Sequence, residues 1–167
     1  MTRRFSILAW SAAVCTYLLI VLGAVVRITG SGLGCGDHWP LCNGHLFPPL
    51  EDIGTVIEWS HRLLASVVSV LVTALAFYAW RSGLARKASY SALALIIPQV
   101  LLGAITVKTG LTPAIVVLHL ATAMLLLAAL LIAATASTGF KRNMLPLLLL
   151  TFVTVLFGAL TANLGAA

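Results

Sequence analysis

The chain has 167 residues, of which 61% are hydrophobic and only 8% are charged, and its formal net charge at pH 7 is +6. Soluble domains carry roughly 25% charged residues, so this composition excludes a soluble globular protein and indicates an integral membrane protein surrounded by lipid. The basic residues are scattered in short segments between apolar stretches and form no stripe. That pattern argues against nucleic acid as a partner.

Five apolar stretches approach or exceed the roughly 18–20 residues that a helix needs to cross the hydrocarbon layer. The first follows arginines but lacks a small-residue cleavage site, so we interpret it as a retained helix rather than a signal peptide. The predicted spans are about 5–28, 56–80, 88–108, 113–137 and 144–164. The predicted fold is all-α and integral to the membrane: a four-helix transmembrane bundle plus a fifth transmembrane helix, in a single transmembrane domain over residues 1–167.

The charges predict the orientation of these spans. If the chain crosses the membrane five times, the basic residues on one side are Arg3, Arg4, Arg81, Arg86, Lys87, Lys141 and Arg142. The acidic residues on the other side are Asp37, Glu51, Asp52 and Glu58. By the positive-inside rule, we expect a multi-pass protein of the cell membrane with a cytoplasmic N-terminus. The loop 30–55 and the C-terminus would be external.

Two histidines lie near the starts of predicted helices. Thr55-Val56-Ile57-Glu58 has the form of a capping box, which would begin the second helix six residues before His61. The pair Thr112-Pro113 is typical of a helix start and lies seven residues before His119. At a rise of about 1.5 Å per residue, both imidazoles would lie at similar depth at the same end of the bundle.

An internal repeat supports this pairing. Leu22-Gly23-Ala24 precedes Thr29-Gly30, a loop and His61, and Leu102-Gly103-Ala104 precedes Thr109-Gly110, a tight turn and His119. Each predicted helix pair is therefore one copy of a unit, as in other membrane proteins with internal repeats. Phe157-Gly158-Ala159 opens a third copy that has no matching histidine.

The two histidines are candidate metal ligands. Ionisable side chains within membrane spans are costly and by default mark a functional site; the alternative is that each ring hydrogen-bonds to a neighbouring helix. Zinc normally requires a third protein ligand, whereas heme requires axial imidazoles and an apolar slot between helices. We therefore predict that His61 and His119 are the axial ligands of one heme iron.

Three charged residues are candidates for other roles at this site. Glu58 stands one helical turn outward from His61, where a carboxylate could act as a base or stabilise a developing cation. Its structural alternative is helix capping and an ion pair with Arg62. Arg27 and Arg62, at the external interface, are candidate ligands of the heme propionates, and their alternative is snorkelling to lipid headgroups.

The cysteines of the long loop are expected to be paired. Cys35 and Cys42 fall on the side assigned to the oxidising compartment, which favours a disulfide that staples the loop over the site. Reversible redox exchange is the alternative. Cys15 is expected to pack within a helix, and His38 and His45 are expected to form loop hydrogen bonds.

Taken together, these motifs resemble those of the heme A synthase family. The resemblance rests on Val26-Arg27-Ile28-Thr29-Gly30-Ser31-Gly32-Leu33-Gly34-Cys35, Trp39-Pro40-Leu41-Cys42, Glu58-Trp59-Ser60-His61-Arg62 and Leu102-Gly103-Ala104 ahead of a histidine-bearing helix. It spans nearly the whole chain, although Gly36-Asp37-His38 departs from the Cys-Pro-Asp-Trp-Pro sequence common in the family.

The resemblance implies an oxidoreductase that converts the C8 methyl group of heme O into the formyl group of heme A for terminal oxidase biogenesis. It implies Glu58 as the catalytic residue, His61 and His119 as heme ligands, and a Cys35–Cys42 disulfide, with heme b, heme O or both bound. Typical members have eight spans in two similar halves, whereas this chain has one half plus a helix, so a homodimer is the expected assembly. Heme O synthase is a further expected partner. The alternatives are a non-catalytic b-type cytochrome and a heme-binding assembly subunit.

Overall fold

The structure is a computed structural model that describes residues 3–49, 51–136 and 145–163. Within those residues it contains helices and no strand. The helices are α1 (Arg3–Ile28), the 3-10 helix η1 (Ser31–Leu33), α2 (Ile53–Ser82), α3 (Arg86–Lys108), α4 (Pro113–Ala134) and α5 (Leu145–Asn163). Four of them, α1 to α4, are long and apolar enough to cross a membrane, and α5 is apolar over Leu149–Ala162. The predicted all-α membrane fold is therefore confirmed.

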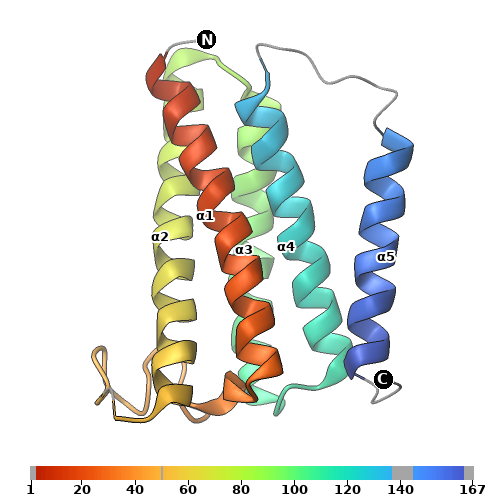
Figure 1. Cartoon of the computed structure of the whole chain (residues 1–167). Coiled ribbons are helices and arrows are strands. Elements are labelled where there is room, and N and C mark those ends of the chain that lie inside the picture. The colour runs from red at the N-terminus through yellow and green to blue at the C-terminus, as the bar shows by residue number, and fades with distance from the viewer. Residues whose placement is uncertain (1–2, 50, 137–144, 164–167) are drawn as a thin grey trace.

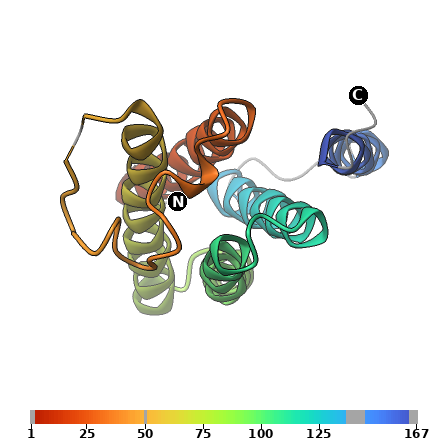
Figure 2. The same ribbon diagram turned by 90° about the horizontal axis from the view of Figure 1, so that it is seen from below.

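Helices α1 to α4 form an up-and-down bundle (Figure 1). Helix α1 packs against α2 and α4, and α3 packs against the same two helices, so α2 and α4 lie on one diagonal of the bundle (Figure 2). Helix α5 stands outside the bundle and contacts α4. We call the end of the bundle that carries the α1–α2 connection the loop end, and the opposite end the N-terminal end.

The packed core lies toward the N-terminal end. Small residues of α1 let the helices approach there, and larger aliphatic side chains of α2 and α4 fill the interior, among them Val68, Val72, Leu75, Leu126 and Leu130. Toward the loop end the packing opens: α1 after Thr16, α3 after Gln99 and α4 before Ala123 contain no buried residue. The interior of the loop-end half is thus lined by half-buried side chains.

Helix α2 begins earlier than the sequence pattern predicts. Its N-cap is Asp52, whose carboxylate accepts the backbone N–H of Thr55 at 2.7 Å. The predicted capping box is therefore wrong, because a better N-cap residue, an aspartate, lies three positions upstream of Thr55. Helix α4 does begin at Pro113, as predicted. His61 lies nine residues past its N-cap and His119 seven past Thr112, so their depths along the helix axes differ by about 3 Å.

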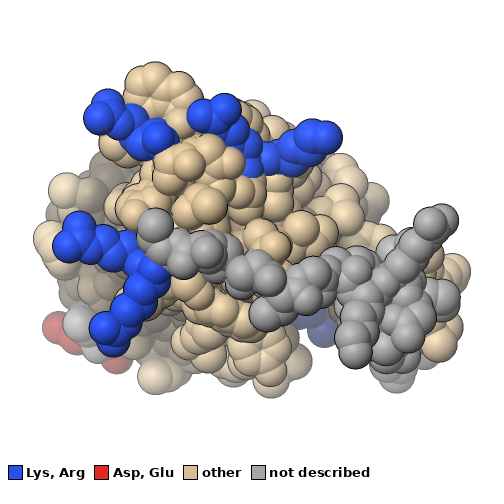
Figure 3. Space-filling view, turned by 90° about the horizontal axis from the view of Figure 1, so that it is seen from above, with Lys and Arg blue, Asp and Glu red and all other residues tan. Residues whose placement is uncertain are grey.

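Acidic residues lie only at the loop end of the bundle, whereas basic residues lie at both ends, with Arg27, Arg62 and Lys108 at the loop end. Basic side chains crowd the N-terminal end, where α1 begins and the α2–α3 connection lies (Figure 3): Arg3, Arg4, Arg81, Arg86 and Lys87. The four acidic residues all lie in the α1–α2 connection or in the first two turns of α2. Lys141 and Arg142, predicted at the basic side, lie outside the described residues.

Candidate functional site

The loop-end half of the bundle brings the two predicted imidazoles together. His61 lies on α2 and His119 on α4, the two helices that stand on one diagonal of the bundle. Each histidine side chain is only partly accessible, because the surrounding helices cover it.

A glycine on the neighbouring helix accommodates each ring. A Cβ at Gly23 of α1 would lie 3.2 Å from Cε1 of His61, and a Cβ at Gly103 of α3 would lie 3.3 Å from Cε1 of His119. Such distances are tighter than ordinary van der Waals contact, so any larger residue would push the imidazole aside. The repeated Leu-Gly-Ala segments therefore have a physical purpose: their glycines leave room for the two rings.

One nitrogen of each histidine ring has no hydrogen-bond partner. Nδ1 of His61 and Nδ1 of His119 are buried without a hydrogen-bond partner in the part of the chain that the structure describes. Orphaned polar atoms of this kind are rare in folded proteins and call for a functional explanation. No group of three or more His, Cys, Asp or Glu side chains suited to a metal ion occurs among residues 3–49, 51–136 and 145–163. Two imidazoles from α2 and α4 in the same half of the bundle fit a heme better than a zinc ion, which would need a third protein ligand.

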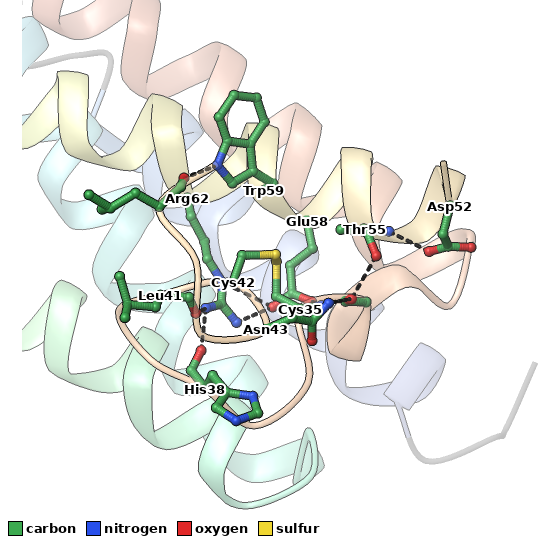
Figure 4. Close-up of a disulfide and its surroundings, with 12 residues drawn as sticks. Cys35, His38, Leu41, Cys42, Asn43, Asp52, Thr55, Glu58, Trp59 and Arg62 are labelled. Carbon is green, nitrogen blue, oxygen red and sulfur yellow. Dashed lines mark hydrogen bonds and ion pairs between the residues drawn. A yellow bond between two sulfur atoms is a disulfide. The ribbon is translucent and has the colours of Figure 1, made fainter. Parts of the chain in front are cut away.

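Glu58 lies one turn toward the loop end from His61 and is 3% exposed. Its Oε1 accepts from Nε of Arg62 at 3.1 Å and from Nη2 at 2.5 Å, and its Oε2 accepts the backbone N–H of Cys35 at 2.7 Å (Figure 4). The ion pair with Arg62, which was the structural alternative for Glu58, is thus present. The carboxylate also fastens the cysteine loop to α2, a contact that the sequence pattern did not predict.

Arg62 holds the same loop from the other side. Its Nη1 donates to the carbonyl oxygens of His38 at 2.6 Å and Leu41 at 2.7 Å. A guanidinium has five N–H donors, and the bonds to Glu58 and to these two carbonyls engage four of them. The arginine predicted to bind propionates is therefore largely occupied in fixing the loop.

The cysteine loop is an ordered element. Cys35 and Cys42 form the predicted disulfide, and an antiparallel bridge joins Cys42 to His45. Trp59 of α2 donates its indole N–H to the carbonyl of Leu46 at 2.9 Å. The predicted loop hydrogen bonds of His38 and His45 are made by their backbones. Together these bonds hold the loop against the first turns of α2 (Figure 4).

Two further residues belong with the site. Arg27, predicted as a second propionate ligand, donates from Nη2 to the carbonyl oxygen of Ala162 near the end of α5. Gln99 of α3, absent from the sequence predictions, is 8% exposed and places its Nε2 3.4 Å from Nε2 of His119. Gln99 could have been found from the sequence, because it is a polar residue inside an apolar span and such side chains usually face the bundle interior.

Comparisons with known proteins agree with this geometry. A family model described as COX15-CtaA, cytochrome oxidase assembly protein, matches residues 6–167. A heme A synthase of Alkalihalophilus pseudofirmus is 38% identical over 133 residues, which are 77% of this chain and 45% of that protein. A heme A synthase of Bacillus licheniformis is 44% identical over 105 residues, 60% of this chain and 34% of the relative. A third, of Bacillus pumilus, is 38% identical over 138 residues, 78% of this chain and 45% of the relative.

The matched region covers less than half the length of each of these relatives. The family model matches residues 6–167, which include the two histidines, Gly23, Gly103 and the cysteine loop. The family model covers almost every residue, so the chain belongs to the COX15-CtaA family of cytochrome oxidase assembly proteins.

Proposed function

We propose that this protein oxidises the C8 methyl group of heme O to the formyl group of heme A, for terminal oxidase biogenesis. The observation that carries the proposal is that His61 of α2 and His119 of α4 both lie in the loop-end half of the bundle, each ring against a glycine of the neighbouring helix. The relatives named heme A synthase support the choice of reaction. Conversion of the methyl group consumes one water and releases four protons and four electrons, and an external acceptor takes up the electrons.

The residues of the loop-end half divide the work. His61 and His119 would bind the iron of heme O, or of a heme b cofactor, and orient the porphyrin in the open interior. Bound heme supplies a redox-active iron close to the substrate methyl group. Glu58 would take up a proton released during oxidation, or stabilise developing positive charge, because one lone-pair site of its carboxylate is not used by Arg62 or Cys35. The remaining N–H of Arg62 and the guanidinium of Arg27 would meet the propionates.

The Cys35–Cys42 disulfide and Arg62 contribute by holding the loop closed over the site. A fixed cover limits the access of bulk water to the reacting methyl group and strengthens the electrostatic effect of Glu58. The orientation that follows from the charge distribution puts the loop end outside the cell and the basic N-terminal end in the cytoplasm. Heme O synthase, which would supply the substrate, and a second copy of the chain are the partners that this function implies.

The test is the heme content of cells that make this chain together with heme O. Acid-extracted heme separated by chromatography should contain heme A when the wild-type chain is present, and His61→Ala should abolish it. Glu58→Gln should retain bound heme but accumulate heme O or a hydroxylated intermediate. Normal heme A production by Glu58→Gln would rule out the role given to this carboxylate.

A second candidate is heme binding without catalysis, as in a b-type cytochrome or an assembly subunit. The observation in its favour is the engagement of both Glu58 oxygens in structural hydrogen bonds. It predicts a stable, redox-active heme b in the purified protein and only unaltered heme in the extract. The same chromatogram therefore separates the two functions.

A further inference from the structure

The two repeat units, α1–α2 (the first half) and α3–α4 (the second half), differ in residue type at positions where the repeat would be expected to match. Leu19 stands four residues before Gly23, and Gln99 stands four residues before Gly103. Likewise Leu64 stands three residues after His61, at the position that Thr122 takes after His119. Two apolar side chains in the first half are thus replaced by two polar ones in the second.

The polar pair forms a hydrogen-bond chain that ends on His119. The hydroxyl of Thr122 donates to Oε1 of Gln99, which fixes the orientation of the amide so that its NH₂ group faces the imidazole. Gln99 is 8% exposed, so water does not compete effectively for that group. The amide N–H then donates to Nε2 of His119, over 3.4 Å.

This bond uses the lone pair of Nε2. With Nδ1 of His119 buried in the bundle, iron would bind this ring through Nε2. A nitrogen cannot accept a hydrogen bond and donate the same lone pair to a metal. The residues equivalent to Gln99 and Thr122 in the first half are Leu19 and Leu64, which have no hydrogen-bond donor that could compete with iron for a nitrogen of His61.

We propose that Gln99 is a positioning residue that makes the two axial imidazoles unequal, with His61 the stronger ligand and His119 the exchangeable one. The inference rests on the proposed heme site and adds to it. Gln99 holds the His119 ring in place when no ligand is bound and must release Nε2 before iron can bind there. A ligand position that opens readily suits a chain that has to receive and release heme.

The test measures binding of ferric heme b to the purified full-length chain in detergent, followed by the Soret band. Gln99→Leu copies the residue of the first half and should tighten binding about fivefold, because one neutral hydrogen bond is worth about 1 kcal/mol. It should also increase the low-spin, six-coordinate fraction at a fixed heme concentration. The change should vanish in a His119→Ala background but persist in a His61→Ala background.

Two variants make the test independent of folding effects. Thr122→Val keeps the side-chain shape while removing the hydroxyl that orients Gln99, so it should shift affinity in the same direction by less. Thr106→Val, on the same helix as Gln99, removes a hydroxyl that donates within α3 and should leave the affinity unchanged.

Unchanged or weaker binding in Gln99→Leu, or an equal effect in the His119→Ala background, would overturn the inference while leaving the heme site intact. If Gln99→Leu does not fold, Thr122→Val decides by the same criterion. Failure of the wild-type chain to bind heme would overturn the proposed function, and this inference with it.

Discussion

Gly23 and His61 lie in direct contact across α1 and α2, so close that a Cβ on residue 23 would come within 3.2 Å of the imidazole Cε1. Gly103 and His119 repeat the relationship across α3 and α4 at 3.3 Å. The two contacts place each ring against a neighbouring helix and direct it toward the diagonal of the bundle. The position of the candidate ligands is therefore set by two residues that have no side chain.

Replacement of either glycine by alanine should weaken heme binding. The added methyl group in Gly23→Ala would displace the ring by a few tenths of an ångström, and overpacking of this kind costs about 1–3 kcal/mol. We expect roughly a tenfold loss of heme affinity, measured by optical titration of the purified chain.

Gly158 provides the matched control for that change. It lies in Phe157-Gly158-Ala159, which resembles the two Leu-Gly-Ala segments, and a Cβ there would meet nothing within 4 Å. Gly158→Ala should leave heme affinity unaltered and should stabilise α5 slightly, since alanine is the better helix former. Equal affinities of the Gly23 and Gly158 variants would show that the notch around His61 has no part in binding.

Each histidine should be required for the heme spectrum. His61→Ala and His119→Ala each remove one of the two candidate axial imidazoles, so a bound heme should change from low-spin six-coordinate to high-spin. Absorption spectra of the ferric and ferrous forms measure this directly. Replacement of His45, which lies on the surface of the cysteine loop, by alanine is the control and should not change the spectrum; a low-spin spectrum in either core variant would point to a different ligand.

Much of this fold was predictable, because spans are determined by length and hydrophobicity alone. The predicted spans 5–28 and 88–108 compare with Arg3–Ile28 and Arg86–Lys108 in the structure. The start of α2 was not predictable from the capping pattern, because Asp52 and Thr55 both have the chemistry of an N-cap. Only the three-dimensional placement of the connection decides between them.

The candidate iron ligands were predictable from the sequence, but the hydrogen bonds that hold the neighbouring residues in place were not. The two histidines stood out as ionisable groups in apolar spans, and their repeat context suggested a common site. The hydrogen bond from Cys35 to Glu58 joins residues 23 apart in sequence, and no local pattern reports such a contact. Arg62 was predicted to bind heme propionates, whereas most of its N–H donors bind Glu58 and the carbonyl oxygens of the loop. Backbone carbonyls that accept such bonds cannot be recognised in a sequence, so this role was missed.

Asp52 should make the stability of the protein depend on pH at low pH values. The backbone N–H of Thr55, together with its hydroxyl, holds the pKa of the Asp52 carboxyl below its ordinary value. Its folded-state pKa is depressed, so the carboxylate stabilises the protein at pH values above the unfolded pKa of about 3.9. This contribution is lost as the pH falls through the folded value.

Asp52→Ala should accordingly lower the melting temperature at pH 7, and the difference from wild type should shrink below about pH 4. Asp52→Asn can still accept the N–H of Thr55 and should retain most of the stability at both pH values. Melting followed by circular dichroism in detergent measures the effect. A difference between wild type and Asp52→Ala that is the same at pH 3 and pH 7 would contradict the assignment of Asp52 as a charged N-cap.

The disulfide should stabilise the loop end without being needed for the bundle. Cys35 and Cys42 are seven residues apart, and closing a loop this short restricts the unfolded chain by about 2.5 kcal/mol. The variant with both cysteines replaced by serine should melt on the order of 5 °C lower. A reductant should lower the wild-type melting temperature by a similar amount and should not affect the variant. Cys15→Ser is the control, since Cys15 is outside the disulfide.

The last prediction concerns the charge pair beneath the loop. Arg62→Met would leave the Glu58 carboxylate, which is 3% exposed, with only the Cys35 N–H as a partner. Breaking a buried ion pair from one side costs about 3–5 kcal/mol. The loop carbonyls of His38 and Leu41 would also lose their donor, so we expect a large drop in melting temperature and faster proteolysis of the loop.

Adding Glu58→Gln to Arg62→Met should recover part of that loss, because an amide in place of the carboxylate removes the uncompensated charge while still accepting from Cys35. A double-mutant cycle on melting free energies gives the coupling between the two side chains. Strong coupling in stability, together with retained heme binding in Glu58→Gln, would assign the pair two separable functions: holding the loop and acting on the substrate. Additive losses would mean that the two side chains act independently, and the cover over the site would then depend on the disulfide and Trp59 instead.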